Sequence, residues 1–396
     1  MNNKDTVSIW SRDFILLLII NGTCGLSFQI LAPNLPVYAR QIGFSESLIG
    51  VLVASLAFGA LLSRPFAGPM ADTMNRKKIC VISMLMTSVA VISLEFASIP
   101  PVLIGIRFFH GILFGLNTTV TLTMASAVTP ESKMGRGVGI FGITGIGAQA
   151  IAPAIGIAVV NRWGFPVLFL ITAGISALAA SLVPVLSKNT AGLKNGADNG
   201  GGRKFSIKNI AAPDVIGFAC IAMFFTGVTS SVTNFMVLYG LEKGITNVGF
   251  YFTVFALVLI ATRIYSGTLT DRYSFRLILY PCCVCCASAL IVISFANSFP
   301  VLAVAAVLMG TGYGISTPTV QTAAIRAVEP SRRGIAVATV FAGTDLAHCT
   351  APVLMGIVTE NAGYSIGYRA MCSLMILTVP VIIFTARKKK KAGGAT

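Results

Sequence analysis

Two sets of polar side chains at helical spacing are the parts of this 396-residue chain that could do chemistry. Asp345 and His348 are three residues apart, so on a helix they share one face, one turn from each other. They fall in the middle of the apolar stretch 334–359, where an ionisable side chain is costly and therefore indicates a function. A carboxyl group and an imidazole in such a place can bind and release a proton. The sequence predicts Asp345 as a proton carrier that His348 tunes or shares; the alternative is a structural ion pair of Asp345, for example with Arg107.

The second polar set lies on the apolar stretch 101–127. Its members fall within about 100° of a helical wheel at 3.6 residues per turn, and they are Arg107, His110, Asn117, Thr118 and Thr121. A face of this kind should border an aqueous cavity and not lipid. We expect this face, together with Gln149 from the stretch 137–160, to line a substrate cavity, with His110 as a further proton-coupling candidate. The alternatives are that Arg107 extends to the membrane interface and that His110 only packs.

The elements that must position these residues are membrane helices. The chain is 55% hydrophobic and only 11% charged, whereas a soluble domain carries about 25% charged residues. Apolar stretches of about 20 residues, the length that crosses the hydrocarbon core, recur along the chain, and in lipid they must be helical. Gly, Pro and charge boundaries predict twelve spans, at 13–38, 47–68, 78–98, 101–127, 137–160, 165–187, 213–239, 247–268, 276–297, 300–326, 334–359 and 365–386.

The spans form two groups of six. Residues 188–211 are polar and glycine-rich and should be a flexible cytoplasmic linker between an N-terminal bundle, 1–187, and a C-terminal bundle with a basic tail, 212–396. An offset of 199 residues relates the two groups. It pairs Arg64, Gly68, Asp72, Gly111, Gly115, Pro153 and Gly164 with Arg263, Gly267, Asp271, Gly310, Gly314, Pro352 and Gly363. Since each group has an even number of spans, the two halves should be parallel repeats.

Basic residues give the orientation. One set of alternate loops and both tails carry 22 of the 29 Lys and Arg residues, and that side should be cytoplasmic, with both termini. The net charge of +16 is therefore a topology signal and does not indicate nucleic-acid binding. The cysteines at 282, 283, 285 and 286 lie in an apolar span, so they are expected to pack and not to bind a metal.

A paired motif ends the second and eighth spans. Gly68, Asp72 and Arg76 precede two lysines, and Gly267, Asp271 and Arg276 repeat the pattern. This motif resembles the loop signature of the major facilitator superfamily, although Thr73 and Asn75 depart from it. Physically, the glycine would allow close helix approach, the carboxylate could cap a helix N-terminus, and the arginine could bridge to a partner. We expect these six residues to form gates that break when the two halves rock apart; for the basic residues, plain topology is the alternative.

Two further segments resemble one branch of that superfamily. The glycine-rich stretch 137–156 is similar to the signature of the twelve-helix drug–proton antiporters, and Arg107 with Gly111 resembles the arginine signature of proton-dependent exporters. The alternative is that the glycines only allow tight helix packing, as they would in any transporter.

The resemblance implies an all-α membrane protein with the major facilitator fold. It implies a secondary transporter of a small organic solute in the bacterial inner membrane, working by alternating access and proton antiport, with uptake by symport as the alternative. An ATP-driven pump is disfavoured because no nucleotide-binding loop occurs. An enzyme or a sensor is less expected, because no catalytic constellation occurs and a static protein has no use for repeat symmetry with paired gates. We expect protons and lipid as partners, a monomer, and neither a cofactor nor a metal.

Overall fold

The computed structural model describes residues 9–130, 133–187, 190, 214–329 and 332–392. Within these residues the chain forms eleven α-helices, each long and apolar enough to cross a membrane. Their bounds are α1 Arg12–Gln41, α2 Glu46–Thr73, α3 Arg76–Ser93, α4 Pro100–Val128, α5 Met134–Leu182, α6 Ile216–Glu242, α7 Gly249–Arg272, α8 Phe275–Ser294, α9 Phe299–Ile325, α10 Arg333–Ala362 and α11 Tyr364–Ala392.

Helix α5 contains two of the predicted spans. Its 49 residues would measure about 73 Å at a rise of 1.5 Å per residue, more than twice the thickness of the hydrocarbon core. The helical backbone breaks at Gly164, where φ is 81° and ψ is −179°, a conformation that only glycine adopts readily. With the two segments on either side of this break, the prediction of twelve spans is confirmed.

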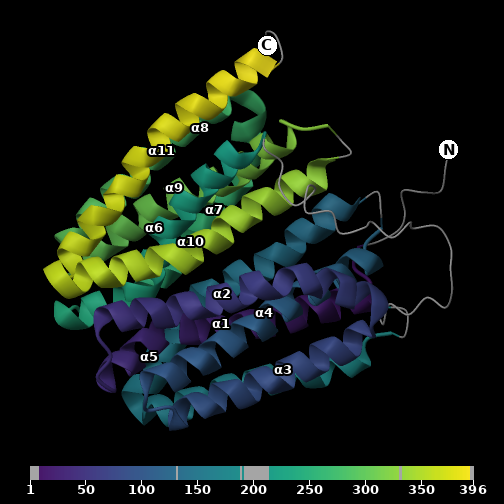
Figure 1. Ribbon diagram of the computed structural model, residues 1–396, viewed down its shortest axis with the longest axis vertical. Helices are drawn as coiled ribbons and strands as arrows, with labels where there is room; N and C mark the ends of the chain where they lie inside the picture. Colours follow the sequence, from purple (N-terminus) through teal and green to yellow (C-terminus); the bar gives the residue numbers. More distant parts are fainter. Residues whose placement is uncertain (1–8, 131–132, 188–189, 191–213, 330–331, 393–396) are drawn as a thin grey trace. The chain divides into compact units, whose positions relative to one another are not determined.

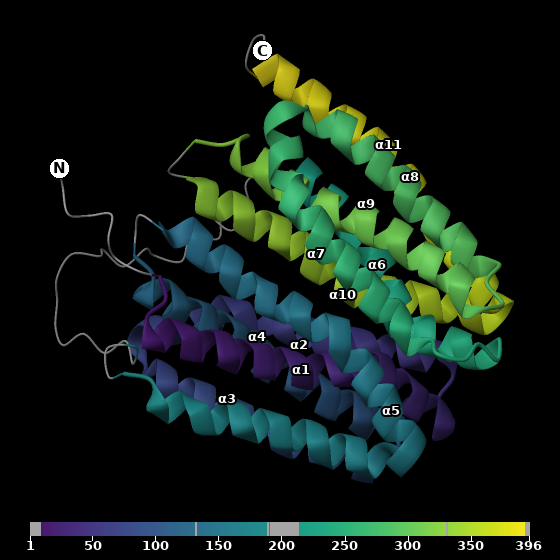
Figure 2. The same ribbon diagram turned by 180° about the vertical axis from the view of Figure 1, so that it is seen from behind.

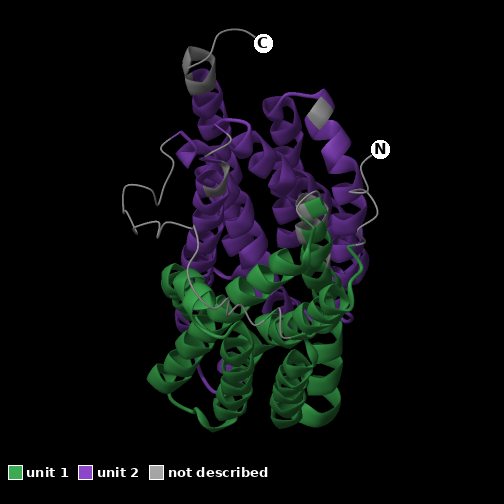
Figure 3. Cartoon of the chain, turned by 90° about the vertical axis from the view of Figure 1, so that its right-hand side faces the viewer, with its two compact units in different colours: residues 1–38, 55–197 green, residues 39–54, 198–396 purple. Residues whose placement is uncertain are grey.

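The chain packs as two compact units (Figure 3). Unit 1 comprises residues 1–38 and 55–197, and unit 2 comprises residues 39–54 and 198–396. The predicted linker 188–211 lies, apart from Thr190, outside the described residues, so its character and the division at 187 and 212 stay predictions. Residues 39–54, which join α1 to α2, pack with unit 2.

Within unit 1, α1 to α5 lie alongside one another (Figures 1 and 2). Helices α2 and α4 touch backbone to backbone at two glycines. A Cβ on Gly111 would lie 2.0 Å from the carbonyl oxygen of Leu56, and a Cβ on Gly115 would lie 2.1 Å from the hydroxyl of Ser63. No larger residue fits at either position without moving a helix, so these glycines set how closely α4 approaches α2.

Unit 2 repeats this contact between α7 and α9. A Cβ on Gly310 would lie 2.9 Å from the carbonyl oxygen of Phe255, and a Cβ on Gly314 would lie 2.2 Å from the hydroxyl of Thr262. All four residues stand 199 positions after their counterparts in unit 1. Gly363, the counterpart of Gly164, has nearly the same backbone angles, with φ 82° and ψ 163°. The internal repeat read from the sequence is therefore present in the packing.

Residues 39–54 meet α10 through two further close approaches. A Cβ on Gly50 would lie 2.4 Å from the carbonyl oxygen of Pro352, and a Cβ on Gly356 would lie 2.3 Å from that of Glu46. The start of α2 and the second half of α10 are thus in backbone contact within unit 2.

Candidate functional site

Unit 1 encloses a cavity of about 300 Å³ between α1, α3, α4 and α5. This volume is at the lower end of the range for small-molecule sites. The wall combines amide and hydroxyl groups with apolar side chains, and no Asp, Glu, Lys or Arg is among its described residues. These residues are Asn21, Cys24, Gly25, Ser27, Phe28, Gln29, Met84, Thr87, His110, Phe114, Asn117, Thr118, Thr121, Gly142, Gly145, Ile146, Gln149 and Ser176.

The polar residues expected at a cavity are nearly all on this wall. The structure places His110, Asn117, Thr118 and Thr121 of α4 there, together with Gln149 of α5. Their part in substrate binding stays a prediction.

Arg107 stands one turn from the wall and contacts it through His110. Its side chain is 4% exposed, and its Nη1 lies 3.1 Å from Nδ1 of His110. A guanidinium group can only donate hydrogen bonds, so Nδ1 must accept and the ring proton of a neutral His110 must sit on Nε2. The Nε of Arg107 has no partner among the described residues, and no carboxylate there forms an ion pair with it. A buried positive charge is therefore left uncompensated beside the cavity.

The remaining polar side chains of α4 use part of their hydrogen-bonding capacity within the protein. The hydroxyl of Ser83 on α3 donates to Oδ1 of Asn117 at 2.6 Å, and the amide nitrogen of Asn117 has no acceptor among the described residues and can donate into the cavity. The hydroxyls of Thr118 and Thr121 donate to carbonyls one turn earlier in α4, so they offer lone pairs only. The wall thus has both donors and acceptors for a ligand.

Several lining residues were missed at the sequence level. Asn21, Ser27 and Gln29 of α1, Thr87 of α3 and Ser176 of α5 also face the cavity. The signal that could have found them is the occurrence of amides and hydroxyls inside apolar spans, the same signal that was used on α4.

The glycine-rich part of α5 differs from its expected role of helix packing. It packs closely at its two ends: a Cβ on Gly156 would lie 2.3 Å from the side-chain nitrogen of Asn34 on α1, and a Cβ on Gly137 would lie 2.5 Å from the side-chain methyl of Thr129. A Cβ on Gly142 or Gly145 would meet no described atom within 4 Å, and both glycines line the cavity. These two positions therefore open space and do not bring helices together.

The predicted proton-coupling pair lies on α10 in unit 2. Asp345 is partly buried and His348 is exposed. Nδ1 of His348 is 3.1 Å from the hydroxyl of Ser230 on α6. The carboxylate and the imidazole are thus one turn apart on one helix, as expected, and the histidine is held to a neighbouring helix by a hydrogen bond.

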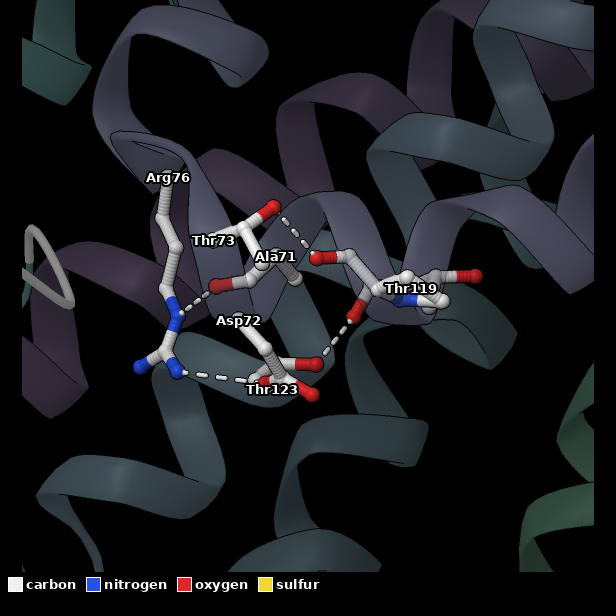
Figure 4. A network of polar contacts seen from close by, with 7 residues as sticks. Ala71, Asp72, Thr73, Arg76, Thr119 and Thr123 are labelled. Atoms are coloured by element: carbon white, nitrogen blue, oxygen red, sulfur yellow. Dashed lines mark hydrogen bonds and ion pairs between the residues drawn. The ribbon is translucent and has the colours of Figure 1, made fainter. Parts of the chain in front are cut away.

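The predicted gate at the end of α2 is a local arrangement (Figure 4). Nη2 of Arg76 lies 3.7 Å from the carboxylate of Asp72, and Nε of Arg76 donates to the carbonyl of Ala71 at 2.7 Å. The expected helix cap is made by a different residue: the side chain of Asn75 accepts a hydrogen bond from the backbone nitrogen of Lys78 at the start of α3. Asp72 instead holds the arginine, because the turn places Asn75 and not Asp72 at the N-cap position.

The gate glycines make no close approach to the described part of the chain. A Cβ on Gly68 or on Gly267 would meet no described atom within 4 Å, so the close helix approach expected at these glycines is not seen within either unit and stays a prediction. In the second copy of the motif, Arg276 is exposed and the side chain of Asp271 lies outside the described residues.

A polar cluster that the sequence did not reveal joins residues 39–54 to α10 and α11. The guanidinium of Arg40 lies 3.6 Å from the carboxylate of Glu46 and 5.7 Å from the ring centre of Tyr364. The backbone nitrogen of Ser47 donates to Oε2 of Glu360 at 2.9 Å. We call these five residues the α2–α10 lock.

Comparison with known proteins gives the family. The chain matches the Major Facilitator Superfamily over residues 17–296 and again over 220–395. It is 24% identical over 393 residues to the uncharacterized MFS-type transporter YhhS of Escherichia coli strain K12, covering 95% of this chain and 92% of that protein. It is 23% identical over 406 residues to the multidrug resistance protein MdtG of Escherichia coli O9:H4, covering 97% and 95%.

Solved structures share the fold at lower identity. The nucleoside transporter NupG matches with a TM-score of 0.76 at 14% identity, covering 95% of this chain and 99% of that one. A bacterial homologue of the lysosomal transporter Spinster, in an inward-facing occupied conformation, matches with a TM-score of 0.74 at 14% identity, covering 94% and 96%. Family match, helical repeat and apolar spans agree, and the chain is a multi-pass membrane transporter that belongs to the Major Facilitator Superfamily.

Proposed function

We propose that this transporter moves a small organic solute across the bacterial inner membrane by alternating access, and that it exports the solute in exchange for protons. The observation that carries the proposal is the cavity of unit 1, which offers amide, hydroxyl and imidazole groups inside a bundle of membrane-spanning helices. Such groups are costly next to lipid and are expected only where a polar solute or water must be held.

Proton coupling is assigned to Asp345, with His348 one turn away. The carboxyl group lies within a span that is otherwise apolar, where its charged and neutral forms differ strongly in solvation. Protonation can then decide which conformation is favoured. His110 is the second candidate on the cavity wall.

Gating is assigned to the two copies of the Gly-Asp-Arg motif and to the α2–α10 lock. These polar contacts are weak enough to break in each cycle, since exposed ion pairs contribute at most about 1 kcal/mol. Loss of such a contact changes the balance between conformers and leaves the fold intact.

The direction of transport rests on resemblance. The relative MdtG is a multidrug resistance protein by name, which fits export, and the resemblance to drug–proton antiporter signatures points the same way. Uptake by symport is the second candidate, and the liposome test below separates it from antiport. The monomer and the cytoplasmic position of both termini belong to the same proposal.

Purified protein in liposomes that contain a pH-sensitive dye tests the proposal. The liposomes are loaded with an organic anion, a sugar, an amino acid or a lipophilic cation and then diluted. In an antiporter, solute leaving the lumen brings protons in and acidifies it; in a symporter the lumen becomes more alkaline. Solute movement without a pH change would reject proton coupling, and no movement of any solute would favour a sensor.

A further inference from the structure

The buried positive charge of Arg107 is not required by the fold, because unit 2 builds the same helix contact without it. The counterparts of Arg107 and His110 at the offset of 199 are Ala306 and Met309. Both lie buried in α9 beside the glycines that pack against α7. The same architecture is therefore stable with apolar side chains here, so the polar pair of unit 1 serves something other than packing.

The cavity wall has donors that lack acceptors in the protein. Nε2 of His110 carries the ring proton, for the reason given above, and no hydrogen bond from it is formed within the described part of the chain. The amide nitrogen of Asn117 is in the same position, since Ser83 occupies its oxygen. Thr87 is also on the wall, and its hydroxyl is buried and has no partner among the described residues. Two donors, Nε2–H of His110 and the amide of Asn117, thus belong to a cavity wall whose described residues include no carboxylate.

Charge and shape together select a ligand class. The guanidinium of Arg107 is in hydrogen-bond contact with the wall residue His110, polarises it through Nδ1 and makes Nε2–H a stronger donor. Hydrogen bonds of this kind to an anion are about twice as strong as those to a neutral group. One turn from His110, the ring of Phe114 stacks on Phe28, with the centroids 4.5 Å apart, and both rings line the cavity. An apolar body can lie there while a negative group meets His110.

We propose that the cavity of unit 1 is a subsite for small organic anions, in which His110 donates to the anionic group and Arg107 acts as the positioning residue. The inference rests on the proposed transport function only in treating the bound anion as a substrate. Cations are disfavoured at the same place, because the cavity wall has no negative group to meet them.

The first test uses the full-length protein in detergent and three probes that share a phenyl ring. Benzenesulfonate is anionic at pH 7, benzenesulfonamide is neutral and benzylamine is cationic. Binding is measured by the shift in unfolding temperature, which rises with ligand concentration over the dissociation constant. Benzenesulfonate should stabilise the protein most and benzylamine least. Equal stabilisation by the three probes, or none by benzenesulfonate, would overturn the proposal.

Variants test whether Arg107, acting through His110, causes the preference for anions. Arg107→Gln should weaken benzenesulfonate binding by up to about tenfold, since it removes the charge that strengthens the His110 hydrogen bond but leaves that bond, which contributes on the order of 1.5–3 kcal/mol to a charged group, in place. Arg107→Lys keeps the charge and should retain most of the preference. Arg162→Gln makes the same change on an exposed residue of unit 1, whose guanidinium rests on Trp163, and should bind as the unmodified protein does. Unchanged anion preference in Arg107→Gln would contradict the proposal.

A spectroscopic measurement separates positioning from a merely structural role. The chain has two histidines, so His348→Gln leaves His110 as the single source of signal in protein labelled with ¹⁵N-histidine. We expect a neutral ring with its proton on Nε2, and benzenesulfonate should move the Nε2 resonance. A proton on Nδ1, or no response to the anion, would overturn the assignment. Either failure leaves the liposome test of transport unaffected, so the substrate class and the transport function are tested separately.

Discussion

At the residue scale, two aspartates assigned to the transport cycle have very different surroundings. Asp345 is partly buried in the middle of α10, whereas the side chain of Asp72 is 73% exposed and pairs with Arg76 four residues along the chain. A charge within a membrane span strongly affects the relative energies of the protein's conformations, whereas an ion pair at the surface has only a local effect. Removal of each charge should therefore alter a different property.

Asp345→Asn should abolish the change in lumenal pH while substrate exchange continues, because the variant can no longer bind and release the coupling proton. The dye-filled liposomes measure both quantities. Asp214→Asn is the matched control, since Asp214 is exposed and lies 3.7 Å from Arg332; it should keep coupling. If Asp345→Asn still drives solute against its gradient, the proton carrier lies elsewhere, and a drop in folded protein alone would support the structural ion pair.

Asp72→Asn should slow transport more than it weakens binding, because the carboxylate holds Arg76 in one conformer and does not line the cavity. Its effect on the free energy of unfolding should be at most about 1 kcal/mol. The initial transport rate and the ligand-induced shift in unfolding temperature, measured on the same preparation, report transport and binding separately. Equal rates in Asp72→Asn and the unmodified protein would exclude the gate.

At the element scale, the repeat explains which helix contacts are structural. The Gly111–Leu56 contact of unit 1 recurs as Gly310–Phe255 in unit 2. The tighter contact, at 2.0 Å against 2.9 Å for an added Cβ, is in unit 1. Backbone atoms cannot move aside as a flexible side chain can. The tighter contact should therefore tolerate an added methyl group less well.

Gly111→Ala should lower the free energy of unfolding by about 1–3 kcal/mol through overpacking, and Gly310→Ala should lower it less. Gly174→Ala is the control, because its Cβ would meet no described atom within 4 Å; it should be neutral or stabilising by up to about 1 kcal/mol. Unfolding temperatures in one detergent rank the three variants. The same temperature for Gly111→Ala and Gly174→Ala would show that α2 and α4 adjust freely.

The features that could be predicted from the sequence are those that depend on the local pattern of residues. The predicted span 101–127 agrees with α4, Pro100–Val128, because apolar length and charge boundaries are local properties. The polar face of α4 was predicted for the same reason, since helical geometry fixes which residues share a face.

Features that depend on tertiary packing were missed. Asn75 caps α3 because of the turn that precedes the helix, whereas the pattern suggested Asp72. The contacts of Arg40 and Glu46 with Tyr364 join residues more than 300 positions apart, and no periodicity predicts such a pair. Gly142 and Gly145 open a cavity only because α1 and α4 leave space beside them.

At the scale of the whole molecule, the orientation follows from charge. The loop that contains Gly196, outside the described residues, should face the cytoplasm, because most basic residues of the loops and tails lie on its side. A cysteine at Gly196 should resist an impermeant thiol reagent in intact cells, while one at Gly244, in the turn after α6, should react. Equal labelling of the two positions would overturn the orientation.

Alternating access is the central claim, and it can be tested without a known substrate. In protein whose nine native cysteines are replaced, Thr118→Cys places a single thiol on the cavity wall. An impermeant thiol reagent is applied to right-side-out and to inside-out vesicles, with cysteines at Gly196 and Gly244 as one-sided controls.

We predict that the cavity thiol reacts from both faces of the membrane. A second variant also carries cysteines at Ser47 and Glu360, whose groups are in hydrogen-bond contact. A short bifunctional reagent joins these two cysteines before labelling. The α2–α10 lock should then stay closed, and the cavity thiol should no longer react from the Gly244 face, while it still reacts from the other face. Reaction from a single face, or equal reaction from both faces after the lock is joined, would contradict alternating access through this cavity.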